Sequence, residues 1–309
     1  MKTVFQIFPQ IIRALVAVSL VFVAHAKADD ALLSDQLAGL ETYVACLDKA
    51  APEQYGGPRF ELLRPLEALA VCRKALDTVP DELRAEVFLY AGRAYDAAGQ
   101  HEVAYWLLSR AVDDGLPAAY GQLAYHLYDS EADDKRALAL AQKGHEGGDW
   151  VATNVIASLY AQDRIEGKSI DDALVLAKQG AINGSSLSQF LYAWLLEIKG
   201  NQPINAAIWY QKAHKAGEIR ATGFWAELLE RGIGDADPEP ERAVELYWQA
   251  LKAGDSWTLE AFLKKGRDRS KEVITGIQTK LIDAGLLKGK ADGKVGKRTL
   301  TAIRKIAGL

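Results

Sequence analysis

Five segments in the middle of the chain repeat one spacing of small residues, and this repeat constrains the fold more than any other feature. Each segment starts with an alanine and has a second small residue seven positions later and a glycine eleven positions later. The anchoring alanines are Ala104, Ala137, Ala173, Ala206 and Ala243, and the glycines are Gly115, Gly148, Gly184, Gly217 and Gly254. Successive alanines lie 33 to 37 residues apart, which is a period typical of helical solenoids.

The spacing has a physical reason. Residues seven positions apart lie on one face of a helix, and small side chains there let a neighbouring helix approach closely. A glycine just past the last turn can adopt the positive φ that ends a helix. A second apolar helix follows each glycine, and a single helix hairpin cannot bury its own apolar face. The sequence therefore predicts an all-α protein, a right-handed α-solenoid of stacked helix hairpins with a small helical module at its C-terminus.

The period and the fourth unit, "YQKAHKAGEIRATGFWAELLERGIG", resemble Sel1-like repeats, which are relatives of the tetratricopeptide repeat. The matching residues of that unit are Lys212, Ala213, Gly217, Ala221, Leu228, Leu229, Gly232, Ile233 and Gly234. The resemblance covers about residues 66–263. It implies a superhelix whose concave face binds other proteins, and it implies no catalysis.

The first 28 residues have the form of a secretory signal peptide. Lys2 and Arg13 precede the apolar run from Ala14 to Ala24, and two A-x-A sites follow, at 24–26 and 26–28. The alternative is a permanent membrane anchor, but the run is much shorter than the ~20 residues that span a bilayer. We expect cleavage, a periplasmic location and no stable membrane span in the mature protein.

Cys46 and Cys72 are the two cysteines of the chain. Each lies in a helical pattern, and the break "APEQYGGPRF" between the patterns places the two residues at similar heights in a hairpin. Because an oxidising compartment favours disulfides, we predict a Cys46–Cys72 bond. Residues 29–65 are expected to form a hairpin that caps the N-terminal end of the repeats at 66–265, and the bond would join this cap to the start of the repeats. Two buried free thiols are the alternative.

The C-terminal segment differs from the rest of the chain in charge. Residues 264–309 contain thirteen Lys and Arg residues but only four Asp and Glu residues, whereas the preceding part of the chain is acidic. This asymmetry indicates two modules with different partners.

Residues 270–309 also resemble the common three-helix peptidoglycan-binding domain. The resemblance rests mainly on the segment "DGKVGKRT" after a helix that ends near Gly285, and it implies six binding residues: Leu286, Asp292, Gly293, Val295, Gly296 and Thr299. Asp292 and Gly293 are expected to shape the loop before the last helix, and Gly296 to allow close packing. The alternative is a helical hairpin that only caps the solenoid.

No catalytic or metal-binding motif is evident in the sequence. The histidines His101, His126, His145 and His214 are scattered over different repeats, so we expect no metal site and no cofactor. The adjacent acid pairs are better explained as helix caps than as a general acid and base. The tryptophans Trp106, Trp194, Trp209, Trp225 and Trp248 follow apolar helical positions, and we expect them to pack in the core.

Together these patterns predict a non-enzymatic periplasmic scaffold or regulator. It would bind another envelope protein through the repeats and peptidoglycan through the C-terminal module, and no nucleic acid is expected as a partner. Two alternatives are an inhibitor of a sensor kinase and an accessory subunit of a cell-wall hydrolase or synthase, with the tail only structural.

Overall fold

A computed structural model describes residues 30–50, 65–130, 133–200, 202–265 and 268–308. These residues form helices joined by short turns, with no strand among them, as the sequence predicts. The predicted signal peptide lies outside the described residues. The chain divides into two compact units, Met1–Ala152 and Thr153–Leu309, each of which is described by itself below.

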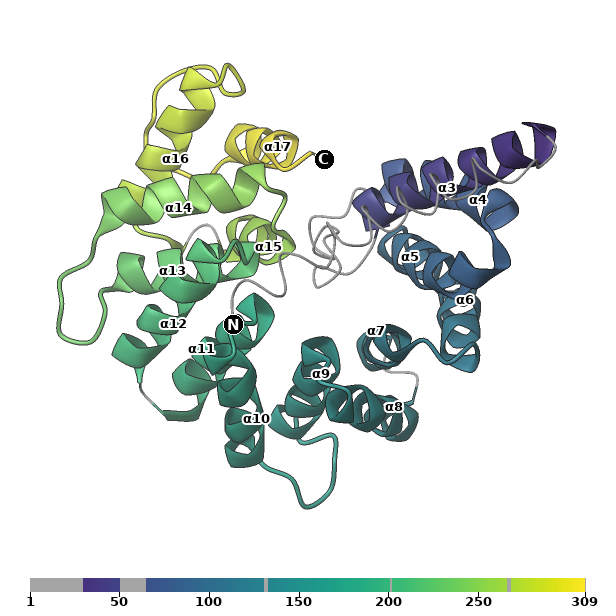
Figure 1. Cartoon of the computed structure of the whole chain (residues 1–309). Helices are drawn as coiled ribbons and strands as arrows, with labels where there is room; N and C mark the ends of the chain where they lie inside the picture. The colour runs from purple at the N-terminus through teal and green to yellow at the C-terminus, as the bar shows by residue number, and fades with distance from the viewer. Residues whose placement is uncertain (1–29, 51–64, 131–132, 201, 266–267, 309) are drawn as a thin grey trace. The chain divides into compact units, whose positions relative to one another are not determined.

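The first unit consists of antiparallel neighbours in chain order (Figure 1). Its helices are α3 (Asp30–Ala50), α4 (Pro65–Thr78), the 3₁₀ turn η3 (Asp81–Leu83), α5 (Arg84–Ala97), α6 (His101–Asp113), α7 (Pro117–Asp129) and α8 (Asp134–Glu146). The unit boundary falls within α9 (Trp150–Ala161). Pro65, Pro117 and similar prolines begin helices, where the missing N–H costs nothing.

The second unit continues the same pattern of consecutive hairpins (Figure 1). Its helices are α10 (Ile170–Ile182), α11 (Ser186–Gly200), α12 (Pro203–Lys215), α13 (Ile219–Arg231), α14 (Pro240–Lys252), α15 (Ser256–Lys265), α16 (Lys271–Asp283) and α17 (Lys297–Ile306). The five repeats predicted from the sequence are the hairpins that begin with α6, α8, α10, α12 and α14.

The repeat residues have the environments that the spacing predicts. All five anchoring alanines are fully buried, and the small residues seven positions later are buried as well. The five glycines have φ between 77° and 93°, a region that strains other residues.

The residue after each of these glycines joins the two helices of its hairpin. Its N–H donates to the carbonyl of the buried small residue, as in the 3.0 Å bond from Asp255 to Ala250 and the 2.8 Å bond from Glu218 to Ala213. In four of the five repeats its side chain then accepts a hydrogen bond from the first turn of the next helix, and these four residues are Asp149, Ser185, Glu218 and Asp255. The repeat spacing alone does not mark this position. Its signal is a polar residue that can cap a helix directly after four of the five repeat glycines.

The predicted disulfide is present at the N-terminal end. Cys46 on α3 and Cys72 on α4 are joined, with an S–S distance of 2.02 Å and a Cα–Cα distance of 4.7 Å. Both side chains are fully buried. The bond links the two helices that precede the repeats.

The C-terminal helices share one hydrophobic core with the last repeats. Ile277 and Leu281 of α16 and Ile303 of α17 belong to the same buried cluster as Tyr247 of α14 and Phe262 of α15. A Cβ added to Gly276 would lie 2.5 Å from a methyl carbon of Val244, so α16 and α14 approach closely at this glycine. The apolar face of α16 therefore covers the end of the repeat stack.

Candidate functional site

The amide of Gln278 organises the C-terminal loop in which the sequence places a binding site. Its Nε2 group donates to Asp292 Oδ1 and to the Lys294 carbonyl, each at 3.0 Å, and lies 3.3 Å from Thr299 Oγ1. Its Oε1 atom accepts the N–H of Gly293 at 2.8 Å. Three of the six predicted residues, Asp292, Gly293 and Thr299, thus converge on one buried side chain.

The environment of Asp292 favours its charged form. The amide of Gln278 and the backbone N–H of Lys294 both donate to its carboxylate, and these hydrogen bonds hold the pKa of Asp292 below its ordinary value. The carboxylate is therefore already engaged within the loop.

The other predicted residues also shape the loop or pack against the core. Leu286 and Val295 pack against the buried cluster, and Thr299 is 5% exposed. Gly293 has a φ of 71°, and an added Cβ would lie 2.6 Å from Cγ of Lys271, so this position requires glycine. The expectation that Gly296 allows close packing is wrong, because a Cβ there would meet nothing within 4 Å. Gly296 is the N-cap residue of α17.

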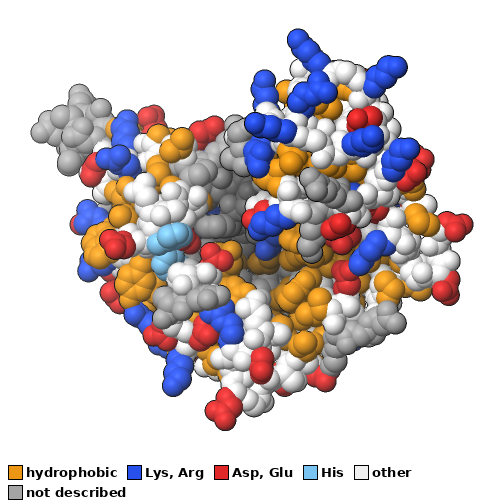
Figure 2. Space-filling view, turned by 180° about the vertical axis from the view of Figure 1, so that it is seen from behind, with side chains coloured by type: hydrophobic (Ala, Val, Ile, Leu, Met, Phe, Trp, Pro, Cys, Tyr) orange, Lys and Arg blue, Asp and Glu red, His pale blue; other side chains and the backbone are white. Residues whose placement is uncertain are grey.

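Basic side chains surround this loop on the outside. Figure 2 shows Lys and Arg side chains gathered over the C-terminal end of the chain, at the upper right of the view. The exposed members on the loop and the first turn of α17 are Lys288, Lys290, Lys294, Lys297 and Arg298. The surface of this end can therefore attract an anionic polymer.

A second candidate surface lies on α10 and α12, and we call its four residues the outer stripe: Val175, Ile182, Ile204 and Ile208. Their exposed fractions are 68%, 66%, 60% and 47%. At about 100° per residue, all four lie roughly 160° to 200° around the helix from the anchoring alanine of their repeat. The stripe is thus opposite the face that packs in the core.

The expectation that the tryptophans pack in the core is wrong for Trp106. It occupies the same repeat position as Val175 and Ile208, but on α6, and it is 57% exposed. One edge packs against Phe88, with the ring centroids 6.0 Å apart. Trp225 is buried, and Trp194, Trp209 and Trp248 pack against the core cluster as predicted.

The fold also brings together two histidines that the sequence analysis treated as separate. His101 and His126 both lie within hydrogen-bonding distance of one carboxylate, that of Asp96. The interpretation that the histidines are scattered over different repeats is wrong for this pair, because α6 and α7 are the two helices of one repeat. Local spacing could not reveal it, since His126 comes from the next helix.

The acid pairs have the structural roles expected of them in two cases. Asp133 accepts a hydrogen bond from Arg136 at the start of α8, and Asp172 forms a capping box with Ser169 at the start of α10. These carboxylates are engaged in helix termini, which agrees with a capping role.

Comparison with known proteins supports the fold. No protein-family model and no curated protein matches the chain. Among solved structures, a Sel1 repeat protein from Oxalobacter formigenes matches with a TM-score of 0.50 and 20% identity, over 79% of this chain and 94% of that one. A protective antigen present in uropathogenic Escherichia coli strains, which displays an SLR fold, matches with a TM-score of 0.42 and 18% identity, over 87% of this chain and 68% of that one.

The likeness to the Sel1 repeat protein supports the repeat prediction at the level of the fold. The chain is an α-solenoid of helix hairpins with the architecture of Sel1-like repeats. Within the described residues, no helix is both long and apolar enough to cross a bilayer.

Proposed function

We propose that this protein is an exported, non-enzymatic scaffold that binds a partner protein through the outer stripe of α10 and α12. The observation that carries the proposal is the exposure of four large aliphatic side chains on the faces of α10 and α12 opposite the core. Single exposed hydrophobic residues are common, but an ordered group of them on adjacent repeats is typical of an interaction surface.

The surroundings of the stripe fit a protein partner. Exposed lysines, Lys178 on α10 and Lys212 on α12, flank the aliphatic residues. Protein interfaces commonly have an apolar centre with a polar rim, and this arrangement supplies both. The Sel1-like fold supports the same proposal, because stacked repeats present equivalent side chains at regular intervals.

Affinity capture from an envelope extract tests the stripe. The purified protein is compared with the double variant Val175→Asp and Ile208→Asp, which places two charges at the apolar centre of the surface. We expect at least a tenfold loss of the captured partner, because charges there would be desolvated on binding. Both positions are exposed, so circular dichroism and the melting temperature should stay close to those of the unchanged protein.

Ala139→Asp is the matched control. Ala139 is exposed and occupies the same repeat position on α8 as Val175 and Ile208 on their helices, but it is not part of the outer stripe. Capture should be unchanged in this variant. Equal capture by the unchanged protein and the double variant would refute the stripe as the binding surface.

We further propose that the C-terminal end associates with peptidoglycan. The support is the basic surface formed by the loop before α17 and the first turn of that helix. In this proposal Leu286, Asp292, Gly293, Val295, Gly296 and Thr299 shape the loop, while the exposed lysines and Arg298 contact anionic groups of the wall.

Co-sedimentation with purified sacculi tests this association. The double variant Lys294→Glu and Arg298→Glu should stay mostly in the supernatant, because it cancels the net positive charge of the loop and the first turn of α17. Lys178→Glu, which changes an exposed lysine on α10, should sediment like the unchanged protein. If all three proteins sediment equally, the C-terminal end is a cap and not a wall-binding module.

A further inference from the structure

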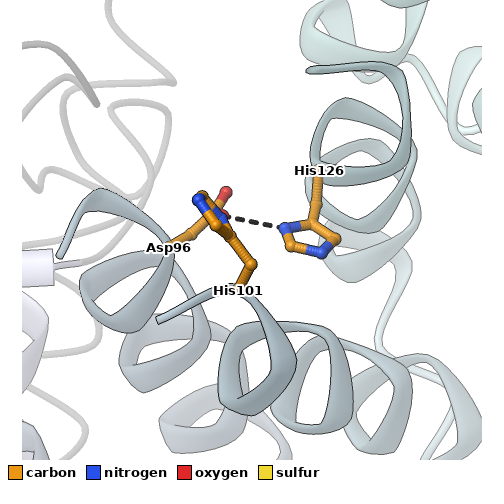
Figure 3. A group of neighbouring side chains, drawn as sticks. All are labelled: Asp96, His101 and His126. Carbon is orange, nitrogen blue, oxygen red and sulfur yellow. Dashed lines mark hydrogen bonds and ion pairs between the residues drawn. The ribbon is translucent and has the colours of Figure 1, made fainter. Parts of the chain in front are cut away.

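Three successive helices direct one carboxylate and two imidazole rings to a common point (Figure 3). Asp96 lies in the last turn of α5, His101 is the first residue of α6, and His126 lies on α7. Gly99, with a φ of 73°, allows the tight turn between α5 and α6 that sets Asp96 beside His101. The three residues come from the first unit alone.

The distances within this group are short. Nδ1 of His126 lies 2.8 Å from Oδ1 of Asp96, and Nδ1 of His101 lies 3.0 Å from the same oxygen. One ligand atom from each residue lies within 4.8 Å of those of the other two. We propose that Asp96, His101 and His126 bind one divalent transition-metal ion of the zinc class.

The choice of metal follows from the ligand atoms. Two imidazole nitrogens and one carboxylate oxygen suit zinc and its neighbours, whereas calcium and magnesium prefer sites made of oxygen alone. With bonds of about 2.0 to 2.1 Å, neighbouring ligands of a tetrahedral zinc ion are roughly 3.3 Å apart. On metal binding, the distance from the Asp96 oxygen to each nitrogen would therefore increase by only a few tenths of an ångström.

The two histidines differ in burial in a way that fits a binding site. The side chain of His126 is 5% exposed and that of Asp96 is 9% exposed, so these two ligands are held by the packed helices. The side chain of His101 is 59% exposed and can adjust as an ion enters. Solvent can reach this side of the group and provide a fourth ligand, as in zinc sites with an open position.

A purely structural role explains the group less well. His126 alone gives the buried Asp96 oxygen a hydrogen-bond partner, and the exposed ring of His101 is not needed to fill the core. In the bound form each neutral ring would present the Nδ1 lone pair to the ion and carry its proton on Nε2. The ion would then link α5, the helix before the first repeat, to both helices of that repeat.

Calorimetric titration of the purified, tag-free protein with zinc chloride tests the proposal. We expect one ion per chain, and visible absorption bands of tetrahedral coordination when cobalt replaces zinc. Zinc should also raise the melting temperature, because it binds the native state. His101→Ala should weaken zinc binding at least tenfold and remove the thermal shift.

His101 is the decisive position because its side chain is exposed and its replacement should leave the fold intact. Asp96→Asn should weaken binding as well, and His145→Ala, which changes a histidine outside the group, should bind zinc like the unchanged protein. Absence of zinc binding in the unchanged protein, or equal affinity and stoichiometry in the His101→Ala variant, would overturn the proposal.

Discussion

The guanidinium of Arg269 lies 3.1 Å from the carboxylate of Glu230, and their side chains are only 9% and 6% exposed. The other oxygen of Glu230 accepts the backbone N–H of Ser270 at 2.6 Å, directly before α16. The hydroxyl of Tyr247 also donates to Glu230. This buried group ties the start of the C-terminal pair of helices to α13 and α14 of the last repeats.

Replacing Arg269 should therefore be costly. Arg269→Ala leaves the Glu230 carboxylate buried without its cation, and we expect the free energy of unfolding to fall by about 3 to 5 kcal/mol. Urea denaturation followed by circular dichroism measures this change. The control is Lys264→Ala at the exposed ion pair with Glu260, where we expect a loss of roughly 0.5 kcal/mol or less. Similar losses in both variants would contradict the assigned role of the buried pair.

Stability should also depend on pH through Asp149, the capping residue after the glycine of the second repeat. Burial raises the pKa of this carboxyl group to about 6, against the opposing effect of backbone hydrogen bonds from Val151, Ala152 and Gly121. Because the folded pKa lies above the unfolded value of 3.8, folding favours the protonated form. The contribution of Asp149 to stability is thus complete below about pH 4 and is lost as the pH rises through 6.

The variant Asp149→Asn isolates this effect. Its amide oxygen can still accept from Val151, but the side chain no longer ionises. Between pH 4 and pH 6, its free energy of unfolding should rise relative to that of the unchanged protein by roughly 2 to 3 kcal/mol. Parallel pH profiles for the two proteins would show that folding does not raise the pKa of Asp149.

Two glycines of the C-terminal loop should respond differently to substitution. Gly293→Ala introduces strain at positive φ and a contact with Lys271, so we expect a loss of about 1 to 3 kcal/mol. Gly296→Ala should cost less, about 0.5 kcal/mol, since its added methyl group meets open space and only the preference for glycine over alanine at an N-cap is lost. Thermal denaturation of both variants checks this difference. A larger loss for Gly296→Ala would contradict the described loop.

Reduction of the Cys46–Cys72 bond should destabilise the N-terminal helices. The two residues are separated by 26 positions, and a loop of this length corresponds to about 2 to 4 kcal/mol. Thiol labelling of the native, unreduced protein should detect no free cysteine. Full labelling of both residues without reductant would show that the bond does not form in solution.

The sequence predicted the repeated part of the fold well because the signal is local. The spacing from Ala206 to Ala213 and Gly217 lies within one helix and its end, where 3.6 residues per turn and the φ of glycine decide the outcome. Gly285 marked a helix end for the same reason. Each of these residues acts on neighbours in its own segment.

Contacts between segments were the part that periodicity could not predict. The bonds of Gln278 to Asp292, Gly293 and Thr299 depend on how the loop folds back over α16. The meeting of His126 with Asp96 depends on the packing of α7 beside α5. Trp106 occupies an apolar position in the sequence, but the helix turns it away from the core.

The central claim is that the outer stripe binds a partner protein. Site-specific photo-crosslinking tests this claim most directly. A photoreactive residue is placed at Val175, at Ile208 or at the control position Ala139 of the full chain in its native envelope. We predict that Val175 and Ile208 give the same covalent adduct with one partner and that Ala139 gives none. No adduct from either stripe position, or an equal adduct from Ala139, would contradict the claim.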